Sequence, residues 1–100
     1  MLIITGTFEV APDRIEAAQS AMTKMMQATR AEAGCLTYDF SQALGAPQRF
    51  RVYEEWEEAA ALDAHRQSAH MTTYRAAMAE NGVRDRALFL IQAGLKVPLG

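Results

Sequence analysis

The sequence has one cysteine, no block of basic residues and no long apolar run. Because Cys35 is alone, an internal disulfide and a cysteine-rich metal site are excluded. Ten scattered Lys and Arg residues stand against twelve Asp and Glu, which argues against a nucleic-acid-binding surface. The longest strongly apolar run, Ala87 to Ile91, is too short to cross a bilayer. We therefore expect a soluble, cytoplasmic protein that binds neither nucleic acid nor membrane.

Three motifs that bind or transform common substrates are also missing. The sequence contains no glycine-rich phosphate loop, no dinucleotide-binding fingerprint and no nucleophile elbow. An enzyme built on this chain therefore has to work without nucleotide cofactors of the usual kinds.

The spacing of apolar residues predicts four strands and three helices in one domain, residues 1–100. In chain order these are strand 2–10, helix 13–33, strand 35–44, strand 49–56, helix 57–67, helix 69–80 and strand 86–97. Ser68 is the expected cap of the third helix. The order predicts an α+β, ferredoxin-like βαββαβ fold with the helices on one face of a four-stranded antiparallel sheet. The other, apolar face then favours a homodimer.

The two histidines, His65 and His70, lie five residues apart in the second helical segment. Five residues turn a helix by about 500°, so the two imidazoles should point about 140° apart. A metal site is therefore not expected, because paired helical ligands are usually four residues apart.

Glu54, Trp56 and His65 are the candidate chemical residues. Strand alternation places Glu54 and Trp56 on one face, and His65 follows Leu62 on the sheet-facing side of its helix. A buried carboxylate needs a partner, so Glu54 is expected to bond to His65 and to orient it as a general base or acid. Two alternatives remain open, a hydrated Glu54 at the sheet rim and a structural His65.

An apolar pocket is expected next to this pair. Met22 and Met25 lie on one helix face and would form its lid, while Tyr38, Tyr74 and Phe89 would line it. Each of these residues could equally pack in the core.

Four stretches resemble the antibiotic biosynthesis monooxygenase family. They are Glu32–Tyr38, Arg51–Trp56, Ala60–His65 and Ser68–His70, within a resemblance over about residues 1–97. The resemblance implies a dimeric α/β barrel of two ferredoxin-like subunits, with a pocket between the sheet and the helices of each. It also implies oxidation of quinols or polyphenols by molecular oxygen without metal, flavin or haem. His65 and Arg75 stand where haem-degrading relatives carry other residues, so haem degradation is not expected.

Two functions follow from this resemblance. The first is a cofactor-independent monooxygenase that acts on a small electron-rich aromatic such as a quinol, with His65 and Glu54 as its catalytic pair and Trp56 as a pocket wall. The second is a non-redox domain that binds or isomerises a small molecule.

Overall fold

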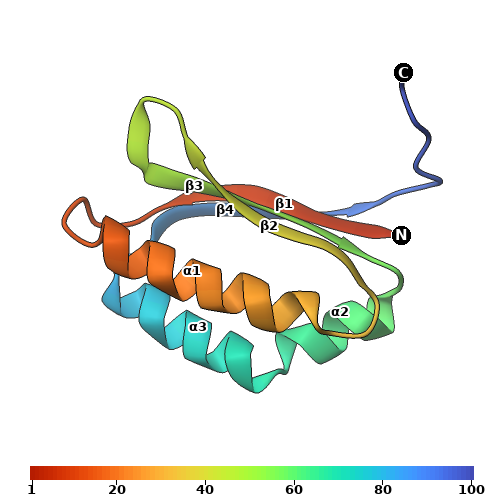
Figure 1. The fold of residues 1–100 in the computed structure, drawn as a ribbon, viewed down its shortest axis with the longest axis horizontal. Helices are drawn as coiled ribbons and strands as arrows, with labels where there is room; N and C mark the ends of the chain where they lie inside the picture. The colour runs from red at the N-terminus through yellow and green to blue at the C-terminus, as the bar shows by residue number, and fades with distance from the viewer.

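The computed structural model describes residues 1–100 as a sheet with a helical layer on one face (Figure 1). The strands are β1 (Leu2–Glu9), β2 (Cys35–Ala43), β3 (Ala46–Trp56) and β4 (Arg84–Gln92). The helices are α1 (Ile15–Arg30), α2 (Ala59–Arg66) and α3 (Ala69–Glu80). This arrangement confirms the predicted ferredoxin-like α+β fold.

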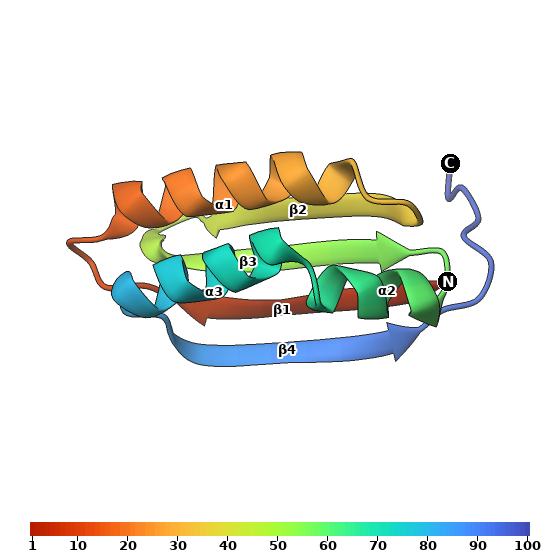
Figure 2. The ribbon, with the colours of Figure 1, turned by 90° about the horizontal axis from the view of Figure 1, so that it is seen from below.

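The sheet has the strand order β2-β3-β1-β4, and each neighbouring pair is antiparallel. Seen from the helical side, α1 lies along β2, α2 and α3 lie over β3 and β1, and β4 forms the far edge (Figure 2). The opposite face of the sheet carries no helix (Figure 1). None of the three helices has the length and apolar content needed to cross a membrane.

Several element ends differ from the predicted ones. Helix α1 begins at Ile15, not at residue 13, because Pro12 and Asp13 form a turn. Strand β3 begins at Ala46 because it pairs with β2 almost to the tip of the hairpin. Strand β4 ends at Gln92, which pairs with the first residue of β1. The N–H of Ala93 still donates to the carbonyl oxygen of Met1 at 2.9 Å, whereas residues 94–97, predicted as strand, lie outside the sheet.

Two apolar clusters fill the space between the sheet and the helices. The first cluster is Phe8, Val10, Ala18, Met22, Phe50 and Met78. The second cluster is Met25, Tyr38, Val52, Trp56 and Leu62. Both draw on alternate residues of the strands, so one face of the sheet is buried, as the alternating pattern predicts.

At Gly6, strand β4 lies unusually close to β1. A Cβ atom built on Gly6 would lie 2.0 Å from the carbonyl oxygen of Ala87 and 2.6 Å from Cα of Leu88. These distances are too short for any side chain, so a substitution at this position would have to push the edge strand away.

A break separates α2 from α3. Ser68 caps α3 as predicted: its Oγ accepts a hydrogen bond from the N–H of Met71 at 3.2 Å. The same hydroxyl donates to the carbonyl oxygen of His65 at 2.7 Å. These bonds satisfy backbone groups at the junction and fix where one helix stops and the other starts.

Candidate functional site

A cavity of about 310 Å³ lies between the inner face of the sheet and α3. Its walls come from all four strands and from α3, and nine of its twelve lining residues are hydrophobic. They are Phe8, Tyr38, Phe40, Val52, Glu54, Met71, Tyr74, Arg75, Met78, Val83, Arg86 and Leu88. A largely apolar cavity with a few polar groups is the usual form of a small-molecule site.

Glu54 places a carboxyl group in this apolar wall. Its side chain is buried, and Oε1 accepts one hydrogen bond, from the indole N–H of Trp56 at 2.9 Å. Burial raises the pKa of Glu54 to about 7, although the Trp56 bond and the charge of Arg66 oppose the shift. Both protonation states are therefore populated near neutral pH, as a group that accepts and returns a proton requires.

The other polar groups of the cavity are phenols and guanidinium groups. Burial raises the pKa of Tyr38 and of Tyr74, so both stay neutral at physiological pH. Arg75 and Arg86 add positive charge to the lining. The cavity therefore combines one titrating carboxyl group, neutral phenols and two permanent cations.

The expected hydrogen bond between Glu54 and His65 is wrong. Glu54 bonds to Trp56, while His65 Nδ1 lies 2.6 Å from Oε2 of Glu32. The Trp56 and His65 rings are in contact, with centroids 4.7 Å apart. His65 is almost completely buried and does not line the cavity. Trp56 thus lies between the two groups that were expected to meet.

Glu32 reaches His65 because of the loop between α1 and β2. Gly34 has a φ of +81°, and a Cβ built on it would lie 2.5 Å from Cβ of Ala61 on α2. A side chain would therefore be strained and would clash with α2. With glycine there, the loop packs directly against α2 and brings the Glu32 carboxylate to the imidazole.

The expected divergence of the two histidines is also wrong. His70 Nε2 lies 2.9 Å from the same Glu32 Oε2 that contacts His65, and the two ring centroids are 6.0 Å apart. The predicted angle assumed one continuous helix, whereas His65 lies on α2 and His70 on α3. The turn at Gln67 and Ser68 redirects the second ring toward the first.

Glu32 also fixes how His65 carries its proton. An imidazole that donates from Nδ1 to a carboxylate leaves Nε2 as an acceptor. In His65 this Nε2 atom is buried and has no hydrogen-bond partner. Burial lowers the pKa of His65, although its bond to Glu32 opposes the shift, so the neutral ring is favoured.

Comparisons with known proteins assign this architecture to a family. The family profile for antibiotic biosynthesis monooxygenases matches residues 1–77. The chain belongs to the antibiotic biosynthesis monooxygenase family. It is 32% identical to Rv0793 of Mycobacterium tuberculosis over 88% of this chain and 86% of that protein. It is 30% identical to YcnE of Bacillus subtilis over 70% of this chain and 74% of that protein.

Solved structures of the antibiotic biosynthesis monooxygenase family share the complete fold. A family member from Deinococcus radiodurans superposes with a TM-score of 0.92 at 27% identity, covering 100% of this chain and 99% of that one. The structure of Rv0793 superposes with a TM-score of 0.86 at 28% identity, covering 97% and 98% of the two chains.

In this chain, three of the predicted site residues line the cavity and five do not. Glu54, Tyr38 and Tyr74 line it. Met25 and Trp56 pack in the second cluster, His65 lies against Trp56, and Met22 belongs to the first cluster. Phe89 lies on the opposite face of the sheet, paired with Thr5 and 64% exposed. Trp56 and Phe89, both expected as walls of the pocket, therefore do not line this cavity.

Sequence reasoning missed Glu32 and Arg86 as residues of interest. Glu32 follows the last turn of α1, where the negative end of the helix dipole disfavours a carboxylate. An acid in that position needs a cationic or hydrogen-bonding partner, and this signal could have identified it. Arg86 lies in β4, where the cavity receives alternate residues, and the pattern of the strand does not distinguish its two faces.

Proposed function

We propose that this chain is a cofactor-independent monooxygenase that oxidises a small electron-rich phenol or quinol. The observation that supports it is a carboxyl group, Glu54, with a pKa of about 7 in an aromatic cavity. A base near neutral pKa in an apolar site can deprotonate a phenol, and the dry surroundings protect the product of that step.

The proposed reaction needs no external reductant. Glu54 takes the phenolic proton, and the phenolate gives one electron to molecular oxygen. The resulting radicals combine through a new C–O bond at a hydrogen-bearing ring carbon ortho or para to the phenolic oxygen. That carbon then loses its proton, the O–O bond breaks, and water leaves. The balance is one phenol and one O₂ to one quinone and one water, with four electrons moving from substrate to oxygen.

The remaining cavity groups suit a negative intermediate. Arg75 and Arg86 would stabilise the charge of the phenolate and of reduced oxygen. Tyr38 and Phe40 stand edge to face, with ring centroids 5.5 Å apart, and provide an aromatic wall. The cavity volume, about 310 Å³, suits one small aromatic molecule.

His65 acts in this proposal as a positioning residue. Its ring packs on Trp56, whose N–H holds the Glu54 carboxylate. Replacement of His65 by Ala should loosen that contact and lower the turnover rate. Because Glu54 remains in place, the loss should be smaller than the loss caused by removing Glu54 itself.

The working form is proposed to be a homodimer that closes into an α/β barrel. The helix-free face of the sheet carries Phe89 and Ile91, which are 64% and 45% exposed. A second copy would cover them with an interface of about 1,000 Å² or more in total. Light scattering at micromolar concentration should show a dimer, and Phe89→Glu should shift it toward monomer. A monomeric parent chain would contradict this part of the proposal.

Oxygen uptake with a panel of phenols and quinols tests the proposed reaction. We expect equal amounts of oxygen consumed and quinone formed, with one atom of ¹⁸O₂ in the product, by protein treated with EDTA. Glu54→Gln should lower the rate by about 10²–10⁴-fold. Glu55→Gln is the matched control and should keep the rate within about a factor of two, because Glu55 does not line the cavity. Tight binding of a phenol without oxygen uptake would favour the non-redox alternative.

A further inference from the structure

The three side chains Glu32, His65 and His70 form a cluster apart from the substrate cavity. Each offers one ligand atom, and these atoms all lie within 4.8 Å of one another. None of the three residues lines the cavity that contains Glu54. They come from three elements, namely the loop after α1, helix α2 and helix α3. We propose that this cluster is a binding site for one divalent transition-metal ion of the zinc type.

The donor set favours such an ion. Two imidazoles and one carboxylate occur together in zinc sites with an open fourth position. Imidazole nitrogen suits zinc and its neighbours in the periodic table, whereas magnesium and calcium prefer oxygen ligands. One carboxylate and two neutral rings leave a bound dication with a net charge of +1, which a water or hydroxide ligand can share.

The geometry requires the three ligand atoms to adjust their spacing. Oε2 of Glu32 lies 2.6 Å from Nδ1 of His65 and 2.9 Å from Nε2 of His70. Around a tetrahedral zinc ion, ligand atoms about 2.0–2.1 Å from the metal lie about 3.3 Å apart. The two O–N distances therefore lengthen by about 0.7 Å and about 0.4 Å, and the two nitrogens, which lie within 4.8 Å of each other, draw together. His70 is partly exposed, so it can make that adjustment.

Metal binding requires no net loss of protons from the imidazoles. Each ring now faces Glu32 with a nitrogen that carries a proton, and the metal takes the place of both protons. For His65 the proton moves to Nε2, an atom that is buried and without a partner in either form. For His70 it moves to the nitrogen on the other side of a partly exposed ring. The exchange therefore adds no buried polar group without a partner.

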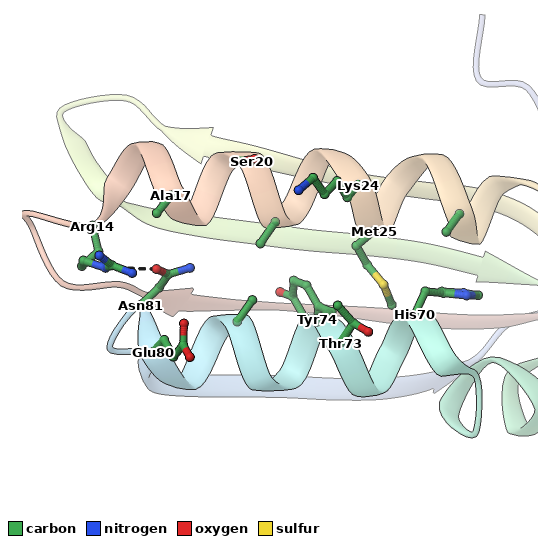
Figure 3. Close-up of a pocket in the computed structure, with 13 residues that line it drawn as sticks. Arg14, Ala17, Ser20, Lys24, Met25, His70, Thr73, Tyr74, Glu80 and Asn81 are labelled. Atoms are coloured by element: carbon green, nitrogen blue, oxygen red, sulfur yellow. Dashed lines mark hydrogen bonds between the residues drawn. The ribbon is translucent and has the colours of Figure 1, made fainter.

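The fourth ligand position would open toward solvent. His70 lines one end of a groove of about 430 Å³ between α1 and α3, beside Met25 and Thr73 (Figure 3). The hydrogen bond from Arg14 to Asn81 lies at the other end of the groove (Figure 3). An ion can therefore enter from the groove, while His65 anchors it from the buried side.

Zinc titration of the EDTA-treated chain tests the site. Isothermal calorimetry should show one Zn²⁺ per chain and no binding of Mg²⁺. His70→Ala and Glu32→Gln should each weaken zinc affinity by about 100-fold or more. Cys35→Ser and Glu57→Gln are the controls, since they remove a nearby thiol and a nearby carboxylate outside the cluster, and both should bind as the parent does.

A spectroscopic measurement on the parent chain removes any dependence on variant folding. The sequence has only two histidines, so long-range ¹H–¹⁵N spectra resolve both rings. Without metal, His65 should be the Nδ1–H tautomer; with one equivalent of Zn²⁺ its proton should be on Nε2, and that of His70 on Nδ1.

Absent or weak zinc binding, unchanged ring spectra, unchanged affinity in His70→Ala, or loss of binding only in Cys35→Ser would each overturn the site. Oxygen uptake by zinc-free protein is a separate measurement, so the metal site and the proposed reaction can fail independently.

Discussion

Glu54 and Glu55 are neighbours in β3 and nearly equally inaccessible, 6% and 4% exposed, yet their acid strengths shift in opposite directions. Glu54 faces the helices, has a single hydrogen bond, and its pKa rises to about 7 through burial. Glu55 faces the other side of the sheet. Hydrogen bonds from Tyr53, Lys96 and Thr37 hold its pKa below the ordinary value.

The comparison shows that burial alone does not decide the charge of a carboxyl group. Two differences decide it: Glu54 lies deep beneath the helices and is strongly desolvated, whereas Glu55 lies close to the surface of the helix-free face and has three donors. Desolvation destabilises the ionised form, while hydrogen bonds and cations stabilise it. One face of the strand therefore holds a permanent anion, and the other holds a group ready to exchange protons near neutral pH.

The largest expected effect of this difference is on stability. Because the folded protein raises the pKa of Glu54 above its ordinary 4.5, the folded state holds that proton more tightly. The contribution of Glu54 to the free energy of unfolding is fully present below about pH 4.5. It is lost as the pH rises to about 7, a change on the order of 3 kcal/mol. Glu54→Gln should abolish this loss, so urea unfolding should find the variant more stable than the parent at pH 8. Equal pH dependence in both proteins would show that Glu54 titrates normally.

The next effect concerns the rate of the proposed oxidation. Glu54 must be ionised to accept a proton, so turnover should approach a tenfold fall per pH unit below about 7, roughly 50-fold between pH 7 and pH 5. The same profile is expected for Glu55→Gln, because the lowered pKa of Glu55 lies outside this window. Initial rates of oxygen uptake, measured over a range of pH values, give this profile. A profile that is flat between pH 5 and 8 would exclude Glu54 as the base.

A smaller effect is expected when Glu55 loses its charge. Glu55→Gln cannot accept hydrogen bonds from Tyr53, Thr37 and Lys96 as strongly as a carboxylate does. The free energy of unfolding at pH 7 should fall by about 1–3 kcal/mol. This change in the free energy of unfolding is opposite in sign to the change expected for Glu54→Gln at pH 8. The same denaturation experiments therefore compare the two faces of the sheet directly. A stabilised Glu55→Gln chain would refute the explanation based on donors.

The smallest effect isolates the single donor of Glu54. Trp56→Phe keeps an aromatic ring and removes the N–H that lies 2.9 Å from Oε1. Without that bond the pKa of Glu54 should rise further, and the midpoint of the rate profile should move upward by up to about one pH unit. The pH profile of oxygen uptake detects this shift. A midpoint unchanged from the parent would mean that the indole contributes packing only.

Much of the fold could be predicted because its patterns are local. Strand alternation placed Glu54 and Trp56 together on the inner face, and Ser68 marked the start of α3 correctly. The partners of Glu54 and His65 could not be predicted, since they depend on a loop that packs on α2 and on the turn between α2 and α3. Phe89 was placed on the wrong face because β4 is apolar on both sides, so its alternation carries no information.

The absent side chain of Gly6 limits which walls of the cavity can accept substitutions. Leu88, the partner of Gly6 in the sheet, is part of the cavity lining, as is Arg86 on the same strand. Any larger residue at position 6 would displace that wall as a unit, since its Cβ would meet backbone atoms that cannot rotate away. A change of substrate size would therefore have to arise at flexible side chains such as Met71 and Met78 on α3. Mutational libraries should find the β1–β4 side of the cavity intolerant and the α3 side permissive.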